Sequence, residues 1–122
     1  MGFSIGVDCE EIGRFRDKVN DSAFLKRIYT DRELEYCLSR PRPEQHLAAR
    51  FAGKEAVMKA LNGLGSQRKR FFNEIEISAD HEGVPGVKTD DPDLEIKISL
   101  SHSGDMALAF AIASLNRQGH SP

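Results

Sequence analysis

The sequence has little of several features that mark particular classes of protein. It contains no tryptophan and only two cysteines, Cys9 and Cys37, among 122 residues. The cysteines form neither a CxxC pair nor a zinc spacing with the four histidines, so we interpret both as reduced thiols. No apolar run approaches the length of a membrane span, and the N-terminus lacks the layout of a secretory signal. These absences favour a cytoplasmic protein without a membrane partner.

Positive charge is not in excess either. The formal net charge is −2, so a general attraction to nucleic acid is not expected. Hydrophobic residues make up 39% and charged residues 30%, which is the composition of an ordinary globular protein. The length suits one domain with a single core, and neither a repeat nor a linker divides the chain. We expect one domain over residues 1–115 and a disordered tail at 116–122.

Helical patterns dominate the first half of the chain. A short apolar strand at residues 3–7 should deliver Asp8 to its end. Apolar spacing predicts a helix at 11–19 and a second helix that begins at Ser22. Thr30-Asp31-Arg32-Glu33 is a capping box that begins a third helix. The clearest helix covers residues 44–61, where an apolar stripe runs as far as Asn62-Gly63.

Strand patterns dominate the second half. Ile75 and Ile77 alternate with polar residues, and residues 82–86 read as a turn. Residues 94–100 alternate like a half-buried strand. Residues 106–113 are nearly all apolar, so we expect them to form a central strand. The fold class is therefore α+β.

Asp8 and Glu10 are the first candidate site. One residue separates them, so a strand would point both carboxylates to one face. Mg²⁺ prefers oxygen ligands and commonly keeps waters and substrate phosphates in its coordination shell. The alternative is that Asp8 caps the next helix, while Glu10 and Glu11 place negative charge in its first turn. This stretch alone favours the alternative.

Glu55 and Lys59 form the second candidate site. They are four residues apart on the long helix and therefore share one face. Such a pair is often a weak surface ion pair. Here small and apolar residues surround the charges, and charges on a buried helix are costly unless something pairs them. A metal ion and a pyrophosphate would do so.

The third candidate is the polar stretch Ser99-Leu100-Ser101-His102-Ser103-Gly104-Asp105. It follows an alternating strand, and His102 stands near the strand's end. A histidine in this position is often only a surface residue. Hydroxyls, a glycine amide and a histidine together can also hold a phosphate.

Together these stretches resemble the 4'-phosphopantetheinyl transferase superfamily, in particular its small holo-acyl-carrier-protein synthase type. The similarity covers the chain from Ile5 to about Ala113. The motifs that carry it are Gly6-Val7-Asp8-Cys9-Glu10-Glu11-Ile12-Gly13-Arg14, then Arg50-Phe51-Ala52-Gly53-Lys54-Glu55-Ala56 with Lys59-Ala60, and Ser99-Leu100-Ser101-His102-Ser103. The resemblance implies one long helix packed on a small, mainly antiparallel sheet, with the site at a subunit interface.

The resemblance also implies the activity. Such an enzyme transfers the 4'-phosphopantetheine group from coenzyme A to a serine of an apo acyl carrier protein and releases adenosine 3',5'-bisphosphate. It depends on Mg²⁺, for which Mn²⁺ can substitute. Because this chain has one half of the two-half site found in larger members, its site should form between subunits, with His102 from the neighbouring subunit. The small subfamily is typically trimeric, so the resemblance implies a homotrimer.

Residue roles follow from the matched motifs. Asp8 and Glu55 match metal ligands, and Glu10 adds a third carboxylate, as in the larger members of the family. Glu55 or a metal-bound water matches the base, and Lys59 matches the cation that assists the leaving group, so Asp8, Glu55 and Lys59 form the catalytic set. Coenzyme A is expected to contact Arg50, Lys54, Lys59, Ser101, His102, Gly63 and Gly65. The carrier is expected to dock on Arg14, Phe24 and Ile28.

Some positions depart from the family's pattern. Gly53 stands in place of the usual alanine and should loosen the helix slightly. Asn62-Gly63-Leu64-Gly65 differs from the usual glycine-threonine-glycine loop. Within the basic cluster Arg68-Lys69-Arg70, Lys69 and Arg70 could offset this change at the nucleotide, and the alternative is that they belong to a solvated loop. Asp17 and Asp21 lie where basic residues usually meet the acidic carrier, which leaves the identity of the carrier open.

Two other functions remain as alternatives. A metal-dependent phosphodiester hydrolase would use the same carboxylates and lysine, although the net negative charge speaks against a polyanionic substrate. A non-catalytic subunit that binds coenzyme A or the carrier is the other.

Overall fold

The computed structural model describes residues 2–65 and 69–116. The basic residue Arg68 and the expected tail at 117–122 lie outside these described residues. The elements, in chain order, are β1 (Phe3–Glu11), the 3-10 helices η1 (Ile12–Phe15) and η2 (Asp17–Asn20), α1 (Ser22–Ile28), α2 (Asp31–Leu38), α3 (Pro43–Gly63), the 3-10 helix η3 (Phe72–Glu74), β2 (Glu76–Ala79), β3 (Pro85–Lys88), β4 (Leu94–Ser103) and β5 (Met106–Leu115).

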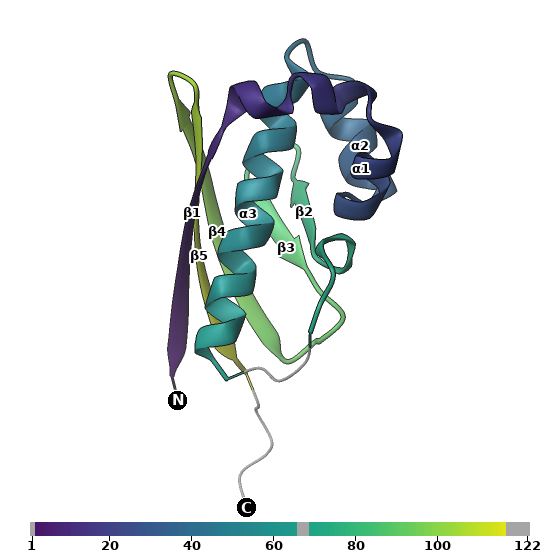
Figure 1. Ribbon diagram of the computed structural model, residues 1–122. Helices are drawn as coiled ribbons and strands as arrows, with labels where there is room; N and C mark the ends of the chain where they lie inside the picture. Colours follow the sequence, from purple (N-terminus) through teal and green to yellow (C-terminus); the bar gives the residue numbers. More distant parts are fainter. Residues whose placement is uncertain (1, 66–68, 117–122) are drawn as a thin grey trace, which may run out of the picture.

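Three long strands form an antiparallel sheet in the order β1-β5-β4. The nearly all-apolar strand β5 is central, as the sequence predicts. A second, two-stranded sheet pairs β2 with β3. The long helix α3 lies along one face of the three-stranded sheet, and α1 and α2 gather beside its N-terminal half (Figure 1). The expected α+β fold with one long helix on a small antiparallel sheet is confirmed.

The helix α3 approaches the sheet closely because the facing residues are small. Ala107, Ala109, Ala111 and Ala113 of β5 are all buried beneath it. A Cβ at Gly6 of β1 would collide with the carbonyl oxygen of Ala56 on α3. Short side chains on both elements thus set the distance at which the side chains of β1 and α3 can meet.

Gly53 of α3 has a packing role that the sequence did not reveal. It is buried, and a Cβ there would lie 3.1 Å from Ile98, 3.3 Å from Ile77 and 3.3 Å from Leu100. The prediction that this glycine mainly loosens the helix therefore missed its main effect. It lets α3 lie close to side chains from β2 and β4.

The beginning of the chain differs from the prediction. The strand β1 continues to Glu11, so Asp8 lies within it rather than at its end, and the helix expected at 11–19 is replaced by η1 and η2. The reason is tertiary pairing: β1 pairs with β5 along its whole length, as far as Glu11 opposite Met106. The amide of Ile12 then donates to the carbonyl of Asp105 at 2.7 Å. Asp8 and Glu10 consequently share one face, and the helix-cap alternative for Asp8 is wrong.

The predicted capping box at Thr30 is present. The Thr30 hydroxyl accepts from the amide of Glu33 at 3.2 Å, and a Glu33 carboxylate oxygen accepts from the amide of Thr30 at 2.8 Å. The predicted long helix is also present, extended at each end to Pro43 and Gly63. No helix among residues 2–65 and 69–116 has the length and apolar character needed to cross a bilayer.

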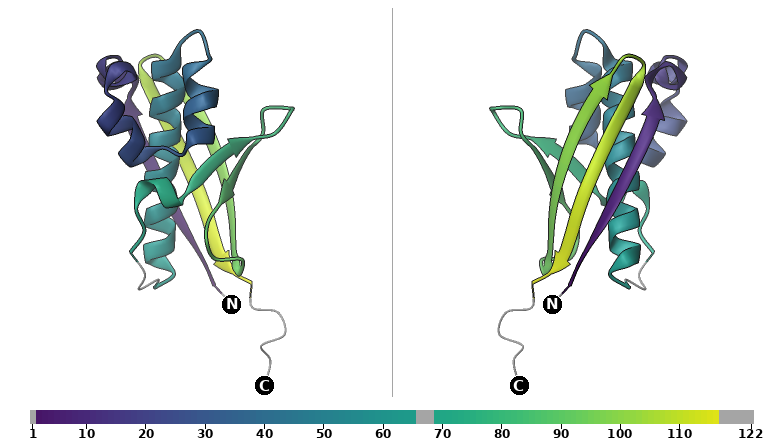
Figure 2. Two further views of the ribbon diagram at one scale, coloured as in Figure 1. Left: turned by 90° about the vertical axis from the view of Figure 1, so that its right-hand side faces the viewer. Right: turned by 90° about the vertical axis from the view of Figure 1, so that its left-hand side faces the viewer.

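Within the described residues, one face of the three-stranded sheet is left uncovered. Figure 2 shows β1, β5 and β4 with α3 behind them and nothing in front. On the β1 and β5 part of this outer face six side chains are apolar and exposed, namely Phe3, Ile5 and Val7 of β1 and Leu108, Phe110 and Ile112 of β5. Exposed apolar patches of this kind commonly mark protein interfaces.

Candidate functional site

The first site candidates, Asp8 and Lys59, meet between β1 and α3. The Lys59 ammonium lies 3.4 Å from one carboxylate oxygen of Asp8 and donates to the carbonyl of Val7 at 2.9 Å. The Asp8 side chain is 12% exposed. Its other carboxylate oxygen is buried and has no hydrogen-bond partner. An unpartnered buried carboxylate oxygen is costly, and a cation placed there would satisfy it.

Glu55 joins this group from α3. Its pKa is raised by burial first and then by the charge of Asp8, while Lys59 opposes the shift. A carboxyl group that is partly desolvated beside another carboxylate resists ionisation. The two acids predicted from separate motifs therefore act on each other in the folded chain.

Glu10 is the third carboxyl group of the set. Its pKa is raised to about 7, by burial first, then by the neighbouring Asp8 carboxylate and, to a smaller extent, by the charge of Glu55. Arg14 opposes the shift and lies 3.6 Å from Glu10. Glu10 therefore lies near the other acids but already has a cationic neighbour.

The carboxylates do not form a complete metal cage by themselves. Within the described part of the chain, no three His, Cys, Asp or Glu side chains come together as a metal-binding group. This arrangement suits Mg²⁺, which typically takes one or two protein carboxylates and fills its shell with waters and substrate phosphates. The free oxygen of Asp8 is the feature that fits such an ion best. We call Asp8, Glu55 and Lys59, with Glu10 beside them, the open cluster.

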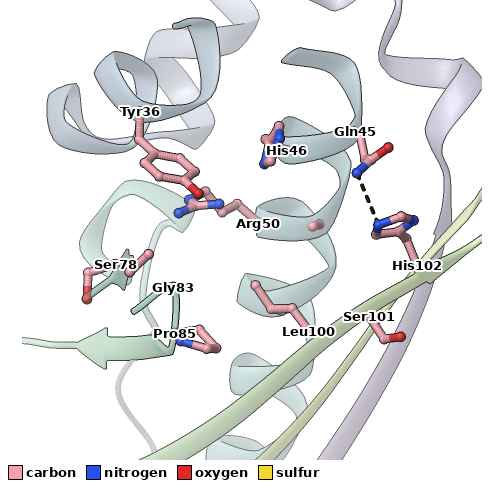
Figure 3. A pocket seen from close by; sticks show the side chains of 12 residues that line it. Tyr36, Gln45, His46, Arg50, Ser78, Gly83, Pro85, Leu100, Ser101 and His102 are labelled. Atoms are coloured by element: carbon pink, nitrogen blue, oxygen red, sulfur yellow. Dashed lines mark hydrogen bonds between the residues drawn. The ribbon is translucent and has the colours of Figure 1, made fainter. Parts of the chain in front are cut away.

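Arg50 lies in a different hollow, between α2, α3, the β2–β3 hairpin and β4. Figure 3 shows Arg50 beside Tyr36, with His102 and Gln45 across the hollow. His102 and Gln45 side-chain nitrogens are 3.1 Å apart, and Ser101 lines the same wall. Basic and hydroxyl groups that face one hollow can hold a phosphate. We call this hollow the Arg50 pocket.

The Arg50 pocket contains residues that the sequence did not single out. The Arg50 guanidinium lies over the Tyr36 ring, 4.2 Å from its centre, and the Arg40 guanidinium lies 4.1 Å from that centre. Ser78 and Pro85 also line the hollow. The sequence assigned none of them a role in a site, because they reach the pocket from separate elements.

The open cluster and the Arg50 pocket do not share lining residues. Asp8, Glu55 and Lys59 are absent from the residues that surround the hollow at Arg50. A single copy of the chain therefore presents the predicted metal ligands and the predicted His102 at separate places.

Lys54 is not available to a ligand, contrary to the prediction that it contacts coenzyme A. Its side chain is fully buried, and its ammonium lies 2.7 Å from a carboxylate oxygen of Glu33. It also donates to the carbonyls of Phe72, at 3.0 Å, and Ile75. Burial lowers the pKa of Lys54 and Glu33 opposes that shift. All three of its donors are engaged within the chain, so its role is structural.

The two predicted loop glycines lie at the far end of α3. Gly63 is the last residue of the helix, where a Cβ would collide with Ser4 of β1. Gly65 has a φ of +81°, which favours glycine. Neither lines the Arg50 pocket.

Of the predicted basic cluster, Arg70 forms an ion pair with Asp90 at 3.1 Å.

The predicted docking residues separate into accessible and buried ones. The Arg14 side chain is 70% exposed, and Phe24 packs against Phe15 and Phe51 at the wall of a shallow hollow that also contains Arg14. Ile28 is only 7% exposed and belongs to the core, so the prediction that it contacts a carrier is wrong for this structure. Asp21, noted as an unusual acid, accepts from the amide of Phe24 at 3.0 Å and caps α1.

Comparison with known proteins agrees with the motifs and the fold. A sequence model described as the 4'-phosphopantetheinyl transferase superfamily matches residues 4–113. A "Holo-[acyl-carrier-protein] synthase" from Chlorobaculum tepidum is 42% identical over 111 residues, which cover 89% of this chain and 94% of that protein. A second relative with the same name, from Geotalea daltonii, is 39% identical over 92% of this chain and 98% of its own length.

Solved structures give the same result. The Mycobacterium tuberculosis acyl carrier protein synthase superposes with a TM-score of 0.74 at 34% identity, covering 93% of this chain and 99% of that one. The structure titled "Chronobacterium ammoniagenes ACPS-CoA complex" superposes with a TM-score of 0.80 at 25% identity, covering 96% of this chain and 100% of that one. The chain therefore belongs to the 4'-phosphopantetheinyl transferase superfamily.

Proposed function

We propose that this chain is a holo-acyl-carrier-protein synthase that transfers 4'-phosphopantetheine from coenzyme A to a serine of an apo acyl carrier protein, with a divalent cation held at the open cluster. The observation that carries the metal proposal is the buried, unpartnered oxygen of Asp8 beside Glu55 and Lys59. The names of close relatives and the coenzyme A complex of a structural neighbour support the reaction.

The reaction forms a bond from the serine oxygen to the phosphorus that carries the pantetheine. It breaks the bond from that phosphorus to the bridging pyrophosphate oxygen and releases adenosine 3',5'-bisphosphate. A bound Mg²⁺, or Mn²⁺ in its place, would supply positive charge to the pyrophosphate when held by Asp8 and Glu55. Such transfers depend mainly on positioning and charge neutralisation.

The side chains of the open cluster fit the remaining roles. Glu55 has a raised pKa, which makes it a better proton acceptor for the serine hydroxyl than an ordinary glutamate. Lys59 carries positive charge next to Asp8 and is half exposed, so it can reach the departing phosphate oxygen. Glu10 is a third possible ligand, in competition with its contact to Arg14.

The Arg50 pocket suits the phosphates of the nucleotide. Arg50 and His102 face one hollow, which Ser101 also lines, and arginine forms strong charge-assisted bonds to phosphate. Because this hollow and the open cluster lie apart in one chain, a complete site is best formed where two copies meet. His102 and Arg50 of one copy would then face the carboxylates of another.

The uncovered sheet face supports a homotrimer. Six apolar side chains of β1 and β5 are exposed there, and β1 also carries Asp8. Association through this face would bury the patch between copies, with Asp8 on the opposite face of the same edge strand. Replacing Ile5 or Phe110 with aspartate should yield monomers in sedimentation experiments and should lower the transfer rate.

The carrier has a candidate docking surface next to the open cluster. Arg14 is exposed and Phe24 offers an aromatic wall in the same hollow. A basic side chain beside an apolar pocket suits an acidic carrier helix with an apolar anchor.

We propose that the chain has neither a nucleic-acid nor a membrane partner, since its net charge is −2. We also propose a cytoplasmic location, since both cysteines are free thiols.

A mass measurement tests the proposed function. Purified chain, coenzyme A and Mg²⁺ are incubated with apo carriers from fatty-acid and polyketide synthesis, and the carrier is weighed by mass spectrometry. We expect at least one carrier to gain one phosphopantetheine group. Release of nucleotide without a modified carrier would favour the hydrolase, and carrier or coenzyme A binding without either reaction would favour a binding subunit.

A further inference from the structure

Two buried cations, Lys54 and Arg50, lie one turn apart on α3 and differ in how many partners they have within the chain. Lys54 is saturated by Glu33 and two carbonyl oxygens. Arg50 is 4% exposed, yet its Nε has no hydrogen-bond partner. Among residues 2–65 and 69–116, no carboxylate pairs with Arg50, whose described contact is the Tyr36 ring. Residues four apart on a helix share a face, so the two cations are neighbours.

Glu33 is the buried carboxylate of this region. One of its oxygens accepts from Lys54 at 2.7 Å and from the amide of Thr30 at 2.8 Å. The other accepts from the amide of Ile77 at 2.7 Å. Glu33 is only 1% exposed. Both oxygens are therefore committed, and water cannot take over for a lost partner.

Glu33 and Arg50 both lie near Cys37. The pKa of Cys37 is raised to about 11, mainly by burial, while the charge of Arg50 opposes the rise and the charge of Glu33 contributes to it. Lys54 likewise interacts with both Glu33 and Arg50. Glu33 and Tyr36 are three residues apart on α2, and the Arg50 guanidinium lies over the Tyr36 ring, so the carboxylate and the guanidinium are neighbours. Lys54 is the cation that holds the carboxylate.

We propose that Lys54 is a positioning residue for nucleotide binding: by keeping Glu33 in a closed ion pair, it prevents this carboxylate from pairing with Arg50 and leaves the guanidinium free for a phosphate of coenzyme A. The inference rests on the proposed function, because it takes the nucleotide as the ligand of the Arg50 pocket. Without Lys54, Glu33 is a buried anion that lacks its partner, and such a charge is strongly unfavourable. Arg50 is the nearby buried cation that could neutralise it.

The test compares both partners of the ion pair by calorimetric titration of coenzyme A. Lys54→Met should weaken binding by about tenfold or more, since a charge-assisted phosphate contact is lost. Glu33→Gln should bind coenzyme A at least as tightly as the unchanged chain, although it unfolds at a lower temperature. The double variant Glu33→Gln with Lys54→Met should regain nearly the original affinity. Lys26→Met, on the exposed face of α1, is the matched charge control.

Transfer kinetics provide a second measurement. Lys54→Met should raise the KM for coenzyme A and change kcat much less, because the open cluster keeps its side chains. The double variant should restore the KM. A role limited to holding the fold predicts instead that binding falls in all three variants in the order of their loss of stability.

The outcomes separate this inference from the proposed function. If the unchanged chain neither binds coenzyme A nor modifies a carrier, the proposed function fails. If it does both, and Lys54→Met binds equally well or the double variant is not restored, only the inference fails. If Lys54→Met does not fold, the test uses Glu33→Gln and the double variant alone. An affinity for coenzyme A that is tenfold weaker than that of the unchanged chain, in either variant, overturns the proposal.

Discussion

Two adjacent residues of α3, Lys54 and Glu55, belong to charge clusters of opposite character. Lys54 faces α2 and η3, is fully buried, and has every donor engaged by Glu33 and by backbone carbonyls. Glu55 belongs with Asp8 of β1, where one carboxylate oxygen has no partner. The first cluster is electrostatically complete within one chain, and the second is not. A buried charge with all its partners serves the fold, whereas one with a missing partner indicates a ligand.

The largest effect is expected from a substitution at Glu55, which tests whether the open cluster serves catalysis rather than the fold. Glu55→Gln should reduce the transfer rate about a thousandfold, since it removes a metal ligand and a proton acceptor. The same change should leave the stability equal or higher, because the raised pKa shows that the fold disfavours the charged form. Mass spectrometry of the carrier and thermal unfolding measure the two results. A strongly destabilised Glu55→Gln variant would mean that the open cluster is structural after all.

The reverse behaviour is expected at Lys54. Lys54→Met leaves Glu33 buried without its cation and should lower the free energy of unfolding by about 3–5 kcal/mol. Lys59→Met is the matched control, because the Lys59 side chain is 53% exposed. It should change the stability by less than about 0.5 kcal/mol and still abolish most of the transfer. Urea unfolding of both variants checks this, and equal losses of stability would erase the distinction between the clusters.

A smaller effect is expected at Thr30, which contacts Glu33 beside the Lys54–Glu33 ion pair. The Thr30 hydroxyl accepts from the amide of Glu33 and donates to a carboxylate oxygen of Glu76 at 2.7 Å. Thr30→Ala should therefore cost about 1–2 kcal/mol of stability. Thr30→Ser keeps the hydroxyl and should recover most of it in the same unfolding experiment. If serine unfolds as easily as alanine, the hydroxyl contacts contribute little.

The smallest effect concerns His46 in the Arg50 pocket. Burial lowers its pKa, the charges of Arg50, Arg40 and His102 lower it further, and Glu44 opposes them. The unfolded chain therefore binds the proton more readily than the folded chain, and stability should fall as the pH drops below about 6.5. His46→Gln should flatten that part of the melting temperature profile. An unchanged profile would show that His46 does not contribute to it.

The sequence predicted the parts of this account that depend on local pattern. The capping box at Thr30, the long helix and the central strand β5 all follow from spacing within one element. The first two motifs likewise supply the members of the open cluster. Periodicity places side chains on a face of an element, and that was enough to bring Asp8 and Glu10 to the same side of β1.

What the sequence could not predict depends on contacts between distant elements. Lys54 looks like a ligand contact in its motif, and only the fold brings Glu33 to its ammonium. Glu10 and Glu11 look like the beginning of a helix, but pairing with β5 keeps them in β1. Ile28 ends an amphipathic helix whose apolar side faces the core. In each case a tertiary partner outweighs the local preference.

The central claim is that Asp8 and Glu55 hold a divalent cation that the transfer requires. The most direct measurement is the rate of carrier modification as a function of Mg²⁺ concentration, for the unchanged chain and for Asp8→Asn, after both have been treated with a chelator. The account predicts no transfer by the chelated chain, recovery with added Mg²⁺, and at least about a tenfold higher Mg²⁺ requirement, or no recovery, for Asp8→Asn. Full transfer in the presence of chelator, or the same Mg²⁺ dependence for both proteins, would contradict it.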